Sequence, residues 1–224
     1  MKVSVIIPVY NEAQALPLVL KELPRADVDD IIVVDNGSTD RTFEAAQAAQ
    51  VKVVFEPRRG YGQACQAGLR AASPESDIIV FLDGDHSDYP EDLPRLLEPI
   101  RRGGADLVIG SRVLGEAQPG SLTPPQRVGN WLACRVIAWR FGHRFTDLGP
   151  FRAIRRPALE RLGLHDPAFG WNVEMQLKAL KAKLAILEVP VRYRPRIGQS
   201  KISGTWTGTL QAGLGILGMI ARHW

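Results

Sequence analysis

Residues 78–85 read IIVFLDGD, five apolar residues followed by the triplet Asp83-Gly84-Asp85. A short, continuous apolar run bounded by turn formers is typical of a strand that is covered on both faces of a parallel sheet. Ligands bind at the carboxyl ends of such strands, and paired carboxylates there suit Mg²⁺ or Mn²⁺ carrying a phosphate-bearing substrate. Alternatively, Asp83 and Asp85 only cap a helix that begins near Pro90, and the triplet alone leaves both interpretations open.

Two earlier segments have the same form, an apolar strand that runs into an acidic turn. They are VSVIIPVYNE (residues 3–12), which ends in Glu12, and IIVVDNGSTD (residues 31–40), in which Asp35 follows the apolar run. Parallel strands end at one edge of the sheet, so these acids are expected beside Asp83 and Asp85. Three acidic turns at one edge predict a site for a hydroxyl-rich, metal-bound ligand such as a nucleotide sugar.

The composition agrees with one substantial core. The chain has 224 residues, of which 45% are hydrophobic, so residues 1–224 are expected to form a single domain. Strand-like and helical segments alternate over residues 1–112, which predicts an α/β fold with a mainly parallel central sheet flanked by helices. The rest of the chain predicts a Gly- and Pro-rich loop, two helices and a strand, over residues 115–125, 126–141, 171–183 and 184–193 respectively.

Several segments, in this order along the chain, resemble family 2 glycosyltransferases, and within them the branch that makes polyprenyl-phosphate sugars. They are VSVIIPVYNE, DIIVVDNGSTDRT, GYGQACQAGL, IIVFLDGDHSDYPED and ADLVIGSR in the first half, and TDLGPFRAI, GWNVEM and GQSKISG in the second. The resemblance implies the GT-A nucleotide-sugar transferase fold, with a Rossmann-like sheet. It also implies that residues 1–112 bind the donor nucleotide and that residues 113–224 bind the acceptor.

The resemblance also implies roles for individual residues in the first half. It places the base and ribose of the donor on Pro8, Tyr10, Glu12, Asp35 and Gly37. Asp83-Gly84-Asp85 falls on the family's metal-binding Asp-x-Asp, so both acids are expected to be catalytic residues that hold Mg²⁺ or Mn²⁺. Ser87 stands where related mannose synthases often have a glutamine that completes the metal shell, which leaves the third ligand and the donor open.

Two glycines between these motifs have two interpretations from the residues alone. Gly60 and Gly62 either let the backbone approach the donor closely or form a tight turn. Their spacing is not that of a dinucleotide-binding fingerprint, because Cys65 occupies the third glycine position.

Basic residues gather late in the chain, although the net charge is only +4. At period two, Arg192, Arg194 and Arg196 would share one face of an extended segment. Ser200 and Lys201 follow on a Gly-flanked loop that could close over a diphosphate, so Arg194, Arg196, Ser200 and Lys201 are expected to bind the acceptor's phosphate. The alternative is a solvated basic edge strand. Nucleic acid is not expected as a partner, because aromatic residues are not interleaved with the basic ones.

The resemblance assigns Arg112 and Arg127 to the acceptor's phosphate. It implies inverting transfer of a hexose from a donor of the GDP-mannose or UDP-glucose type to a polyprenyl or dolichyl phosphate. A lipid phosphate is already anionic at pH 7 and needs positioning more than deprotonation, so Asp147 and Glu174 are expected to position the donor sugar or the acceptor loop. A hydroxyl acceptor would instead need one of them as a general base. A hydroxyl acceptor and a nucleotide-binding scaffold without turnover remain the alternatives.

The sequence also predicts where the protein works. Cys65 and Cys134 are isolated and no signal peptide precedes Val3, so packed thiols and a reducing compartment are expected. Residues 202–221 carry no charge, but their Ser, Thr and Gly content favours a buried or membrane-interfacial helix over a span. The predicted location is therefore cytoplasmic, peripheral at the cytoplasmic face of a membrane.

Overall fold

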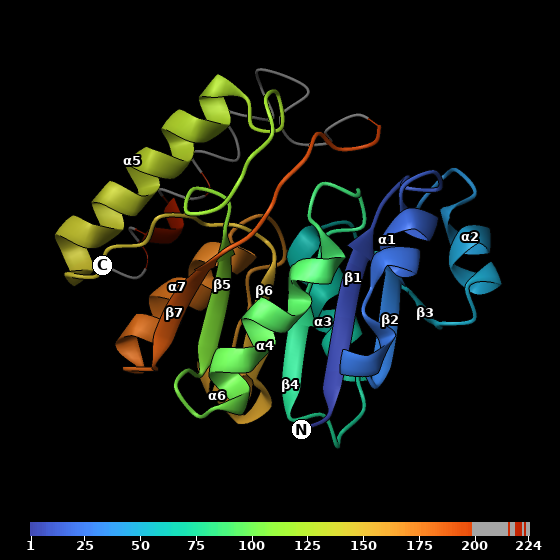
Figure 1. Ribbon diagram of the computed structural model, residues 1–224, viewed down its shortest axis with the longest axis horizontal. Helices are drawn as coiled ribbons and strands as arrows, with labels where there is room; N and C mark the ends of the chain where they lie inside the picture. The colour runs from blue at the N-terminus through green and yellow to red at the C-terminus, as the bar shows by residue number, and fades with distance from the viewer. Residues whose placement is uncertain (199–214, 216–217, 221, 223–224) are drawn as a thin grey trace.

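The computed structural model describes residues 1–198, 215, 218–220 and 222. Over these residues one sheet has the strand order β3-β2-β1-β4-β6-β5-β7 (Figure 1). Neighbouring strands are parallel except where β6 pairs with β4 and β5. The strands are β1 (Val3–Val9), β2 (Asp30–Asp35), β3 (Lys52–Phe55), β4 (Ile78–Phe81), β5 (Leu107–Ser111), β6 (Arg152–Arg155) and β7 (Ile186–Pro190).

Helices cover both faces of this sheet. The α-helices are α1 (Leu16–Glu22), α2 (Thr42–Ala48), α3 (Tyr61–Ala71), α4 (Leu93–Arg101), α5 (Pro124–Phe141), α6 (Arg156–Leu162) and α7 (Trp171–Lys181). Two short 3₁₀ helices, η1 (Arg25–Asp27) and η2 (Pro90–Asp92), precede β2 and α4. Alternate residues of β1 show the two layers: Ile6 packs in a core with α3, α5, α6 and α7, whereas Val5 and Ile7 pack with α1, α2 and α4.

Burial on both faces explains why the strands are apolar without alternation. Every residue of β4 is buried, and Phe81 contacts Trp171 of α7 edge to face, with 5.9 Å between the ring centroids. At its amino end α5 has a capping box, in which Thr123 Oγ1 accepts a hydrogen bond from Gln126 N and the Gln126 side chain accepts one from Thr123 N. Gly142 ends the helix with a φ of 71°.

The mainly parallel sheet and its covering helices confirm the predicted fold class, and α5, α7 and β7 lie within three residues of their predicted bounds. The helix predicted near Pro90 begins as η2, and the residue before it is Tyr89, so neither Asp83 nor Asp85 caps it. Cys65 and Cys134 are buried free thiols, as predicted.

The antiparallel strand β6 was not predicted. Arg152-Ala-Ile-Arg155 is short and has a charge at each end, so it lacks the apolar run of the other inner strands. Arg152 is nevertheless fully buried, because its guanidinium donates to the backbone carbonyls of Asn172 (2.9 Å) and Gly149. β6 lies between β4 and β5 and thus inserts a strand of the second half between two strands of the first.

Most of the predicted carboxyl-terminal helix lies outside the described residues, as do Ser200 and Lys201. Of residues 202–221, Met219 and Ile220 are described and buried, and they pack in the core that contains α5 and α7. Within the described part of the chain, no helix combines the length and the hydrophobicity that crossing a membrane requires.

Candidate active site

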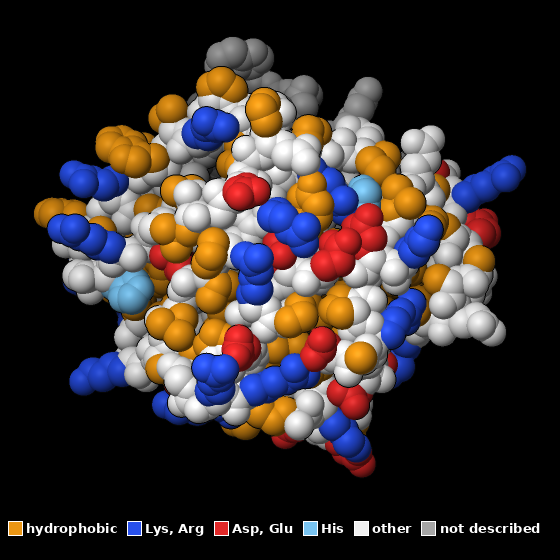
Figure 2. All heavy atoms as spheres, viewed as in Figure 1, with side chains coloured by type: hydrophobic (Ala, Val, Ile, Leu, Met, Phe, Trp, Pro, Cys, Tyr) orange, Lys and Arg blue, Asp and Glu red, His pale blue; other side chains and the backbone are white. Residues whose placement is uncertain are grey.

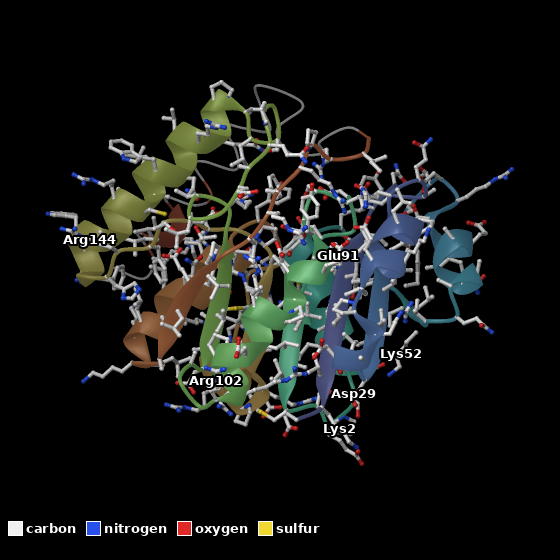
Figure 3. The ribbon with its side chains drawn as sticks, viewed as in Figure 1. Lys2, Asp29, Lys52, Glu91, Arg102 and Arg144 are labelled. Carbon is white, nitrogen blue, oxygen red and sulfur yellow. The ribbon has the colours of Figure 1, made fainter. Side chains whose placement is uncertain are left out.

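Most of the predicted donor residues meet at the carboxyl edge of the sheet. A pocket of about 340 Å³, here called the carboxylate pocket, opens beyond the ends of β1 and β4. It lies at the opposite end of the sheet from Lys2 and Asp29 (Figure 3). The predicted site residues that line it are Pro8, Tyr10, Glu12, Gly60, Asp83, Gly84, Asp85 and Arg196.

Asp85 is held at the floor of this pocket by residues on both sides. It is buried, and its Oδ1 atom accepts hydrogen bonds from the amide N–H and the hydroxyl of Ser87, at 2.9 and 2.6 Å. Its Oδ2 atom forms an ion pair with the guanidinium of Arg196. Ser87 is itself buried and its hydrogen bonds orient Asp85, whereas its role as a third metal ligand, which the sequence left open, stays a prediction.

Asp83 offers the second carboxylate of the pair. Its Oδ1 atom is buried without a hydrogen-bond partner, and burial raises the pKa of this carboxyl group. An unpaired buried carboxylate oxygen beside Asp85, whose other oxygen already pairs with a cation, fits a divalent ion with hard oxygen ligands. Within the described residues no group of three or more His, Cys, Asp or Glu side chains is arranged to hold a metal.

Three predicted donor residues do not line the carboxylate pocket. Asp35 is buried and accepts a hydrogen bond from Ser38 N (2.8 Å), so it shapes the turn after β2. Gly37, with a φ of 74°, lies in the same turn, where an added Cβ would be 3.5 Å from Arg59 Nε. Gly62 packs against the loop of residues 166–168, where an added Cβ would lie 1.9 Å from the carbonyl oxygen of Asp166.

The same loop explains Gly60. An added Cβ there would lie 2.2 Å from the carbonyl oxygen of Pro167, so both glycines are needed for the close approach of two backbone segments. Gly60 also lines the pocket, whereas Phe169, at the end of the loop, contributes an apolar wall. The close approach predicted for the glycines is therefore made to the protein's own loop.

Arg59 and Asn36 complete one wall and were not predicted. The Arg59 guanidinium lies over the Tyr10 ring, 3.6 Å from its centroid. Asn36 accepts a hydrogen bond from Gly60 N (2.8 Å) and donates to the carbonyl oxygens of Glu56 (2.9 Å) and Arg58 (2.7 Å). The position of Asn36 directly after Asp35, in an acidic turn, was the signal that could have identified it.

The late arginines do not form the free basic face that the sequence predicted. Arg192 pairs with Asp92, with 3.0 Å between Nη2 and Oδ1, and Arg196 pairs with Asp85. Arg194 pairs with Glu22 and donates to the backbone carbonyl of His86 (2.7 Å). On the side of the molecule drawn in Figure 2, basic and acidic side chains are interspersed near the middle. Arg192 and Arg194 therefore hold residues 191–197, here called the arginine segment, against the turn that follows β4.

Backbone hydrogen bonds make the same connection. Arg194 N donates to Ser87 O (2.9 Å) and Ile197 N donates to Asp85 O (3.0 Å). These bonds bring the arginine segment, which directly precedes the predicted acceptor loop, alongside the carboxylate pair.

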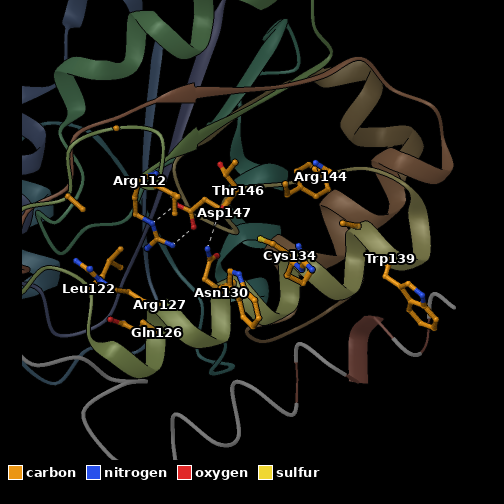
Figure 4. A pocket seen from close by; sticks show the side chains of 17 residues that line it. Arg112, Leu122, Gln126, Arg127, Asn130, Cys134, Trp139, Arg144, Thr146 and Asp147 are labelled. Atoms are coloured by element: carbon orange, nitrogen blue, oxygen red, sulfur yellow. Dashed lines mark hydrogen bonds and ion pairs between the residues drawn. The ribbon is translucent and has the colours of Figure 1, made fainter.

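A second, larger cavity of about 930 Å³ runs along α5 and is here called the α5 cavity. Arg112, Arg127, Arg135 and Arg144 contribute positive charge to its lining, and Trp131 and Trp139 contribute aromatic rings (Figure 4). Trp131 and Trp139 are 60% and 75% exposed. A cavity that joins cations to exposed aromatic rings matches an anion with an apolar body.

Arg112 is fixed by Asp147 at one end of this cavity. Its Nε and Nη2 atoms donate to the two oxygens of Asp147 at 2.8 and 2.7 Å, and its backbone N donates to Asp147 Oδ2 at 2.9 Å. Burial alone would lower the pKa of Arg112, but the buried charge of Asp147 outweighs it and raises that pKa.

Asp147 is held in turn by Glu188 of β7, which the sequence did not identify. Glu188 accepts hydrogen bonds from the backbone N–H groups of Thr146 and Asp147, each at about 3 Å. Glu188 thus anchors the loop of Asp147 to the sheet, while both oxygens of Asp147 accept hydrogen bonds from Arg112. This arrangement suits a residue that positions Arg112 and leaves no free oxygen for a general base.

Glu174 lies outside both cavities. Its buried carboxylate accepts hydrogen bonds from the backbone N–H groups of His165 and Asp166 and pairs with Lys178 (2.7 Å). Burial opposes ionisation, but these partners lower the pKa of Glu174. Glu174 therefore holds the loop that packs on Gly60 and Gly62.

Asp88 is a buried acid in the turn after β4 that lines neither cavity and was not predicted. It is 1% exposed, and neither of its carboxylate oxygens has a hydrogen-bond partner. Burial, followed by the negative charge of Asp83, raises its pKa to about 8, while Arg112 lowers it. It is the third acid of the turn after β4, and that spacing was the available signal.

Comparisons with known proteins agree with this geometry. The family described as Glycosyl transferase family 2 matches residues 4–163. An uncharacterised glycosyltransferase of Mycobacterium tuberculosis is 39% identical over 217 residues, 94% of each chain. The undecaprenyl-phosphate mannosyltransferase of Micrococcus luteus is 34% identical over 235 residues, covering 99% of this chain and 96% of that one. The dolichyl-phosphate hexose transferase of Haloferax volcanii is 32% identical over 203 residues, covering 89% and 86%.

The fold has solved counterparts as well. The glucosyl-3-phosphoglycerate synthase of Mycobacterium tuberculosis, in a crystal structure with Mn²⁺, UDP-glucose and phosphoglyceric acid, has a TM-score of 0.76 and is 25% identical. The match covers 98% of this chain and 80% of that one. Together with the match to the family over most of the sequence, this likeness confirms the predicted GT-A fold. The chain therefore belongs to the family 2 glycosyltransferases.

Proposed function

We propose that this protein transfers a hexose, with inversion, from a nucleotide sugar to a polyprenyl phosphate at a membrane surface, and that it needs Mg²⁺ or Mn²⁺. The carboxylate pocket would bind the donor and the α5 cavity the acceptor. The observation that carries the proposal is the lining of the α5 cavity, which combines Arg112 and Arg127 with the exposed rings of Trp131 and Trp139.

The lining of the α5 cavity supports an amphiphilic acceptor. Arg112 and Arg127 offer charge-assisted hydrogen bonds to a phosphate, and Trp131 and Trp139 offer surface for an isoprenoid chain. The named relatives from Micrococcus luteus and Haloferax volcanii act on undecaprenyl phosphate and dolichyl phosphate by their names, which agrees with this lining. An acceptor of this kind would bring the enzyme to the cytoplasmic face of a membrane.

The chemistry assigned to the donor side is leaving-group stabilisation. Asp83 and Asp85 would hold a divalent ion, which neutralises the charge that develops on a departing diphosphate. Ser87 keeps Asp85 oriented for this task, and Tyr10 with Arg59 forms a wall for the nucleoside. The Mn²⁺ and UDP-glucose bound to the glucosyl-3-phosphoglycerate synthase support the same use of ion and donor.

The phosphate acceptor is preferred to a hydroxyl acceptor because the predicted bases are occupied. Both oxygens of Asp147 bind Arg112, and Glu174 holds a loop outside the cavities. A hydroxyl acceptor would need a general base, and Asp88, the buried acid without hydrogen-bond partners, lines neither cavity.

The test is transfer of label into an organic-extractable product. UDP-glucose, UDP-galactose, UDP-N-acetylglucosamine and GDP-mannose are each incubated with undecaprenyl phosphate and Mn²⁺, Mg²⁺ or EDTA. We expect extractable label with one donor, only with metal, and none with Asp85→Ala. Undecaprenol without phosphate serves as the matched acceptor control and should remain unlabelled.

The acceptor site is tested separately with Arg127→Gln. This change should raise the KM for undecaprenyl phosphate about tenfold and leave the KM for the donor unchanged, because one charge-assisted phosphate contact contributes roughly 1.5 kcal/mol. Arg102→Gln, which removes an exposed arginine at the end of α4, is the control and should change neither constant. Nucleotide binding without any labelled lipid would overturn the proposal in favour of another acceptor or a scaffold.

A further inference from the structure

Arg196 was predicted to bind the acceptor's phosphate, yet it lies in the carboxylate pocket with Asp83 and Asp85. Its Nη2 atom pairs with Asp85 Oδ2, the oxygen of that carboxylate that Ser87 leaves open. The guanidinium therefore places a positive charge directly on an acid that the proposed metal ion needs. Two cations cannot share this position without strong repulsion in a partly buried pocket.

The other side of the same guanidinium lacks a partner. The Nε atom of Arg196 is buried and donates no hydrogen bond, an arrangement that costs free energy unless a ligand supplies an acceptor. In the same pocket, Asp83 Oδ1 is a buried acceptor without a donor. The pocket thus has an unsatisfied donor and an unsatisfied acceptor at once, which a diphosphate and a cation together would satisfy.

We propose that Arg196 exchanges partners during donor loading: it neutralises Asp85 until the divalent ion and the nucleotide bind, and it then binds the nucleotide's diphosphate. The inference rests on the proposed function for the nature of the donor. The planar guanidinium can meet two phosphate oxygens at once, which the single contact with Asp85 Oδ2 does not use.

The backbone allows this exchange without unfolding the segment. Ile197 N donates to Asp85 O (3.0 Å) and Arg194 N donates to Ser87 O (2.9 Å), so main-chain bonds on both sides of Arg196 stay in place while its side chain rotates. The Arg196 side chain is 30% exposed, which leaves one side open for movement. Asp85, at 5% exposure, stays where it is.

A thermodynamic consequence separates this exchange from simple attraction. Metal binding without nucleotide must displace Arg196 and gains no new partner for it, whereas binding with nucleotide provides one. The ion and the nucleotide should therefore bind cooperatively, and by reciprocity each should strengthen the other by the same factor.

The test measures Mn²⁺ binding by the electron paramagnetic resonance signal of free Mn²⁺, with no nucleotide and with saturating UDP or GDP. In Arg196→Gln we expect Mn²⁺ to bind roughly tenfold more tightly without nucleotide, and the enhancement by nucleotide to fall by roughly tenfold. In Arg196→Lys the side chain still places a positive charge beside Asp85. The Mn²⁺ affinity without nucleotide should therefore stay within about twofold of that of the unsubstituted protein.

Arg59→Gln is the matched control. Arg59 lines the same pocket and carries the same charge, but it lies over Tyr10 and does not contact Asp85. Its removal should leave nucleotide-free Mn²⁺ affinity unchanged. The proposal is overturned if Arg196→Gln leaves Mn²⁺ binding unchanged or weaker, or if Arg59→Gln strengthens it equally.

Two further points keep the test decisive. Circular dichroism verifies that Arg196→Gln is folded. If it is not folded, Arg196→Lys decides the matter: its Mn²⁺ affinity without nucleotide should be preserved, and the enhancement of Mn²⁺ binding by nucleotide should be reduced. An unchanged enhancement in Arg196→Lys refutes the exchange. No acceptor is present in these measurements, so failure to label a lipid would refute the proposed function and leave this result standing.

Discussion

Replacing Asp147 with Asn removes the negative charge from the Arg112 pair while keeping the size of the side chain. The Asp147 side chain is 1% exposed and that of Arg112 is 14% exposed, so the pair is effectively buried. The change leaves the guanidinium with an amide in place of a carboxylate. The amide oxygen can still accept one of the two hydrogen bonds at 2.7 and 2.8 Å, but the amide nitrogen cannot accept the other.

The magnitude follows from this burial. Breaking one partner of a buried ion pair costs about 3–5 kcal/mol, because the remaining charge is left without compensation. A domain of this kind has a total stability of roughly 5–15 kcal/mol, so the variant should fold but unfold at a much lower denaturant concentration. The double variant Asp147→Asn with Arg112→Gln removes the uncompensated charge and should recover about 1–3 kcal/mol of the loss.

The assay is urea unfolding at pH 7, followed by tryptophan fluorescence and circular dichroism, together with kinetic constants for the acceptor. Asp27→Asn is the control, since Asp27 pairs with Arg101 at 2.6 Å on the surface, where the side chains are 25% and 37% exposed. A surface pair of this type contributes about 0–1 kcal/mol. We also expect Asp147→Asn to raise the acceptor KM, because Arg112 loses its orientation.

Two results would refute this reasoning about Asp147. A stability loss no larger than that of Asp27→Asn would mean that the pair does not stabilise the fold. A collapse of kcat with unchanged stability and unchanged KM values would mean that Asp147 is a general base, and the preference for a phosphate acceptor would lose its main support.

Three further predictions concern single residues. The pKa of Asp88 is raised from 3.8 to about 8 by burial, so the folded chain holds a proton that the unfolded chain releases, and stability falls as pH rises between these values. In metal-free protein, Asp88→Asn should remove this pH-dependent fall in the free energy of unfolding, which is at most about 6 kcal/mol. Equal unfolding free energies of Asp88→Asn and the unsubstituted protein at pH 8.5 would contradict the prediction. Gly62→Ala should lower the free energy of unfolding in urea by about 1–3 kcal/mol and weaken nucleotide binding, because its Cβ would lie 1.9 Å from the Asp166 carbonyl oxygen. Gly129→Ala is the control, since no atom lies within 4 Å of its added Cβ, and it should cause neither loss. Burial raises the pKa of Asp83, so Mn²⁺ affinity should begin to fall above the ordinary range of Asp as the pH is lowered, and a fall confined to below about pH 4 would contradict this.

The arrangement at the carboxyl edge was predictable because it follows from the chain direction of the strands. Once β1 and β4 are recognised as parallel strands, Glu12, Asp83 and Asp85 must leave the sheet at the same end. No tertiary contact is needed for that inference, only the apolar runs and the turns that end them.

The partners of the charged side chains were not predictable in this way. Period two predicts a shared face for Arg192, Arg194 and Arg196, but it does not reveal that they pair with Asp92, Glu22 and Asp85. Those acids come from segments more than 90 residues earlier, and the pairing depends on how the arginine segment crosses the end of the sheet. The role of Asp147 was left open for the same reason, since Arg112 lies 35 residues away.

The place of β6 in the sheet determines how this enzyme can be recombined with its relatives. The last strand of the first half, β5, has hydrogen-bonded neighbours only in β6 and β7 within the described residues, and β4 also pairs with β6. A chimera joined after residue 112 would therefore change every strand contact of β5 and one side of β4. Grafting individual loops that follow the strands would keep these contacts, so donor and acceptor preferences are better exchanged loop by loop than as halves.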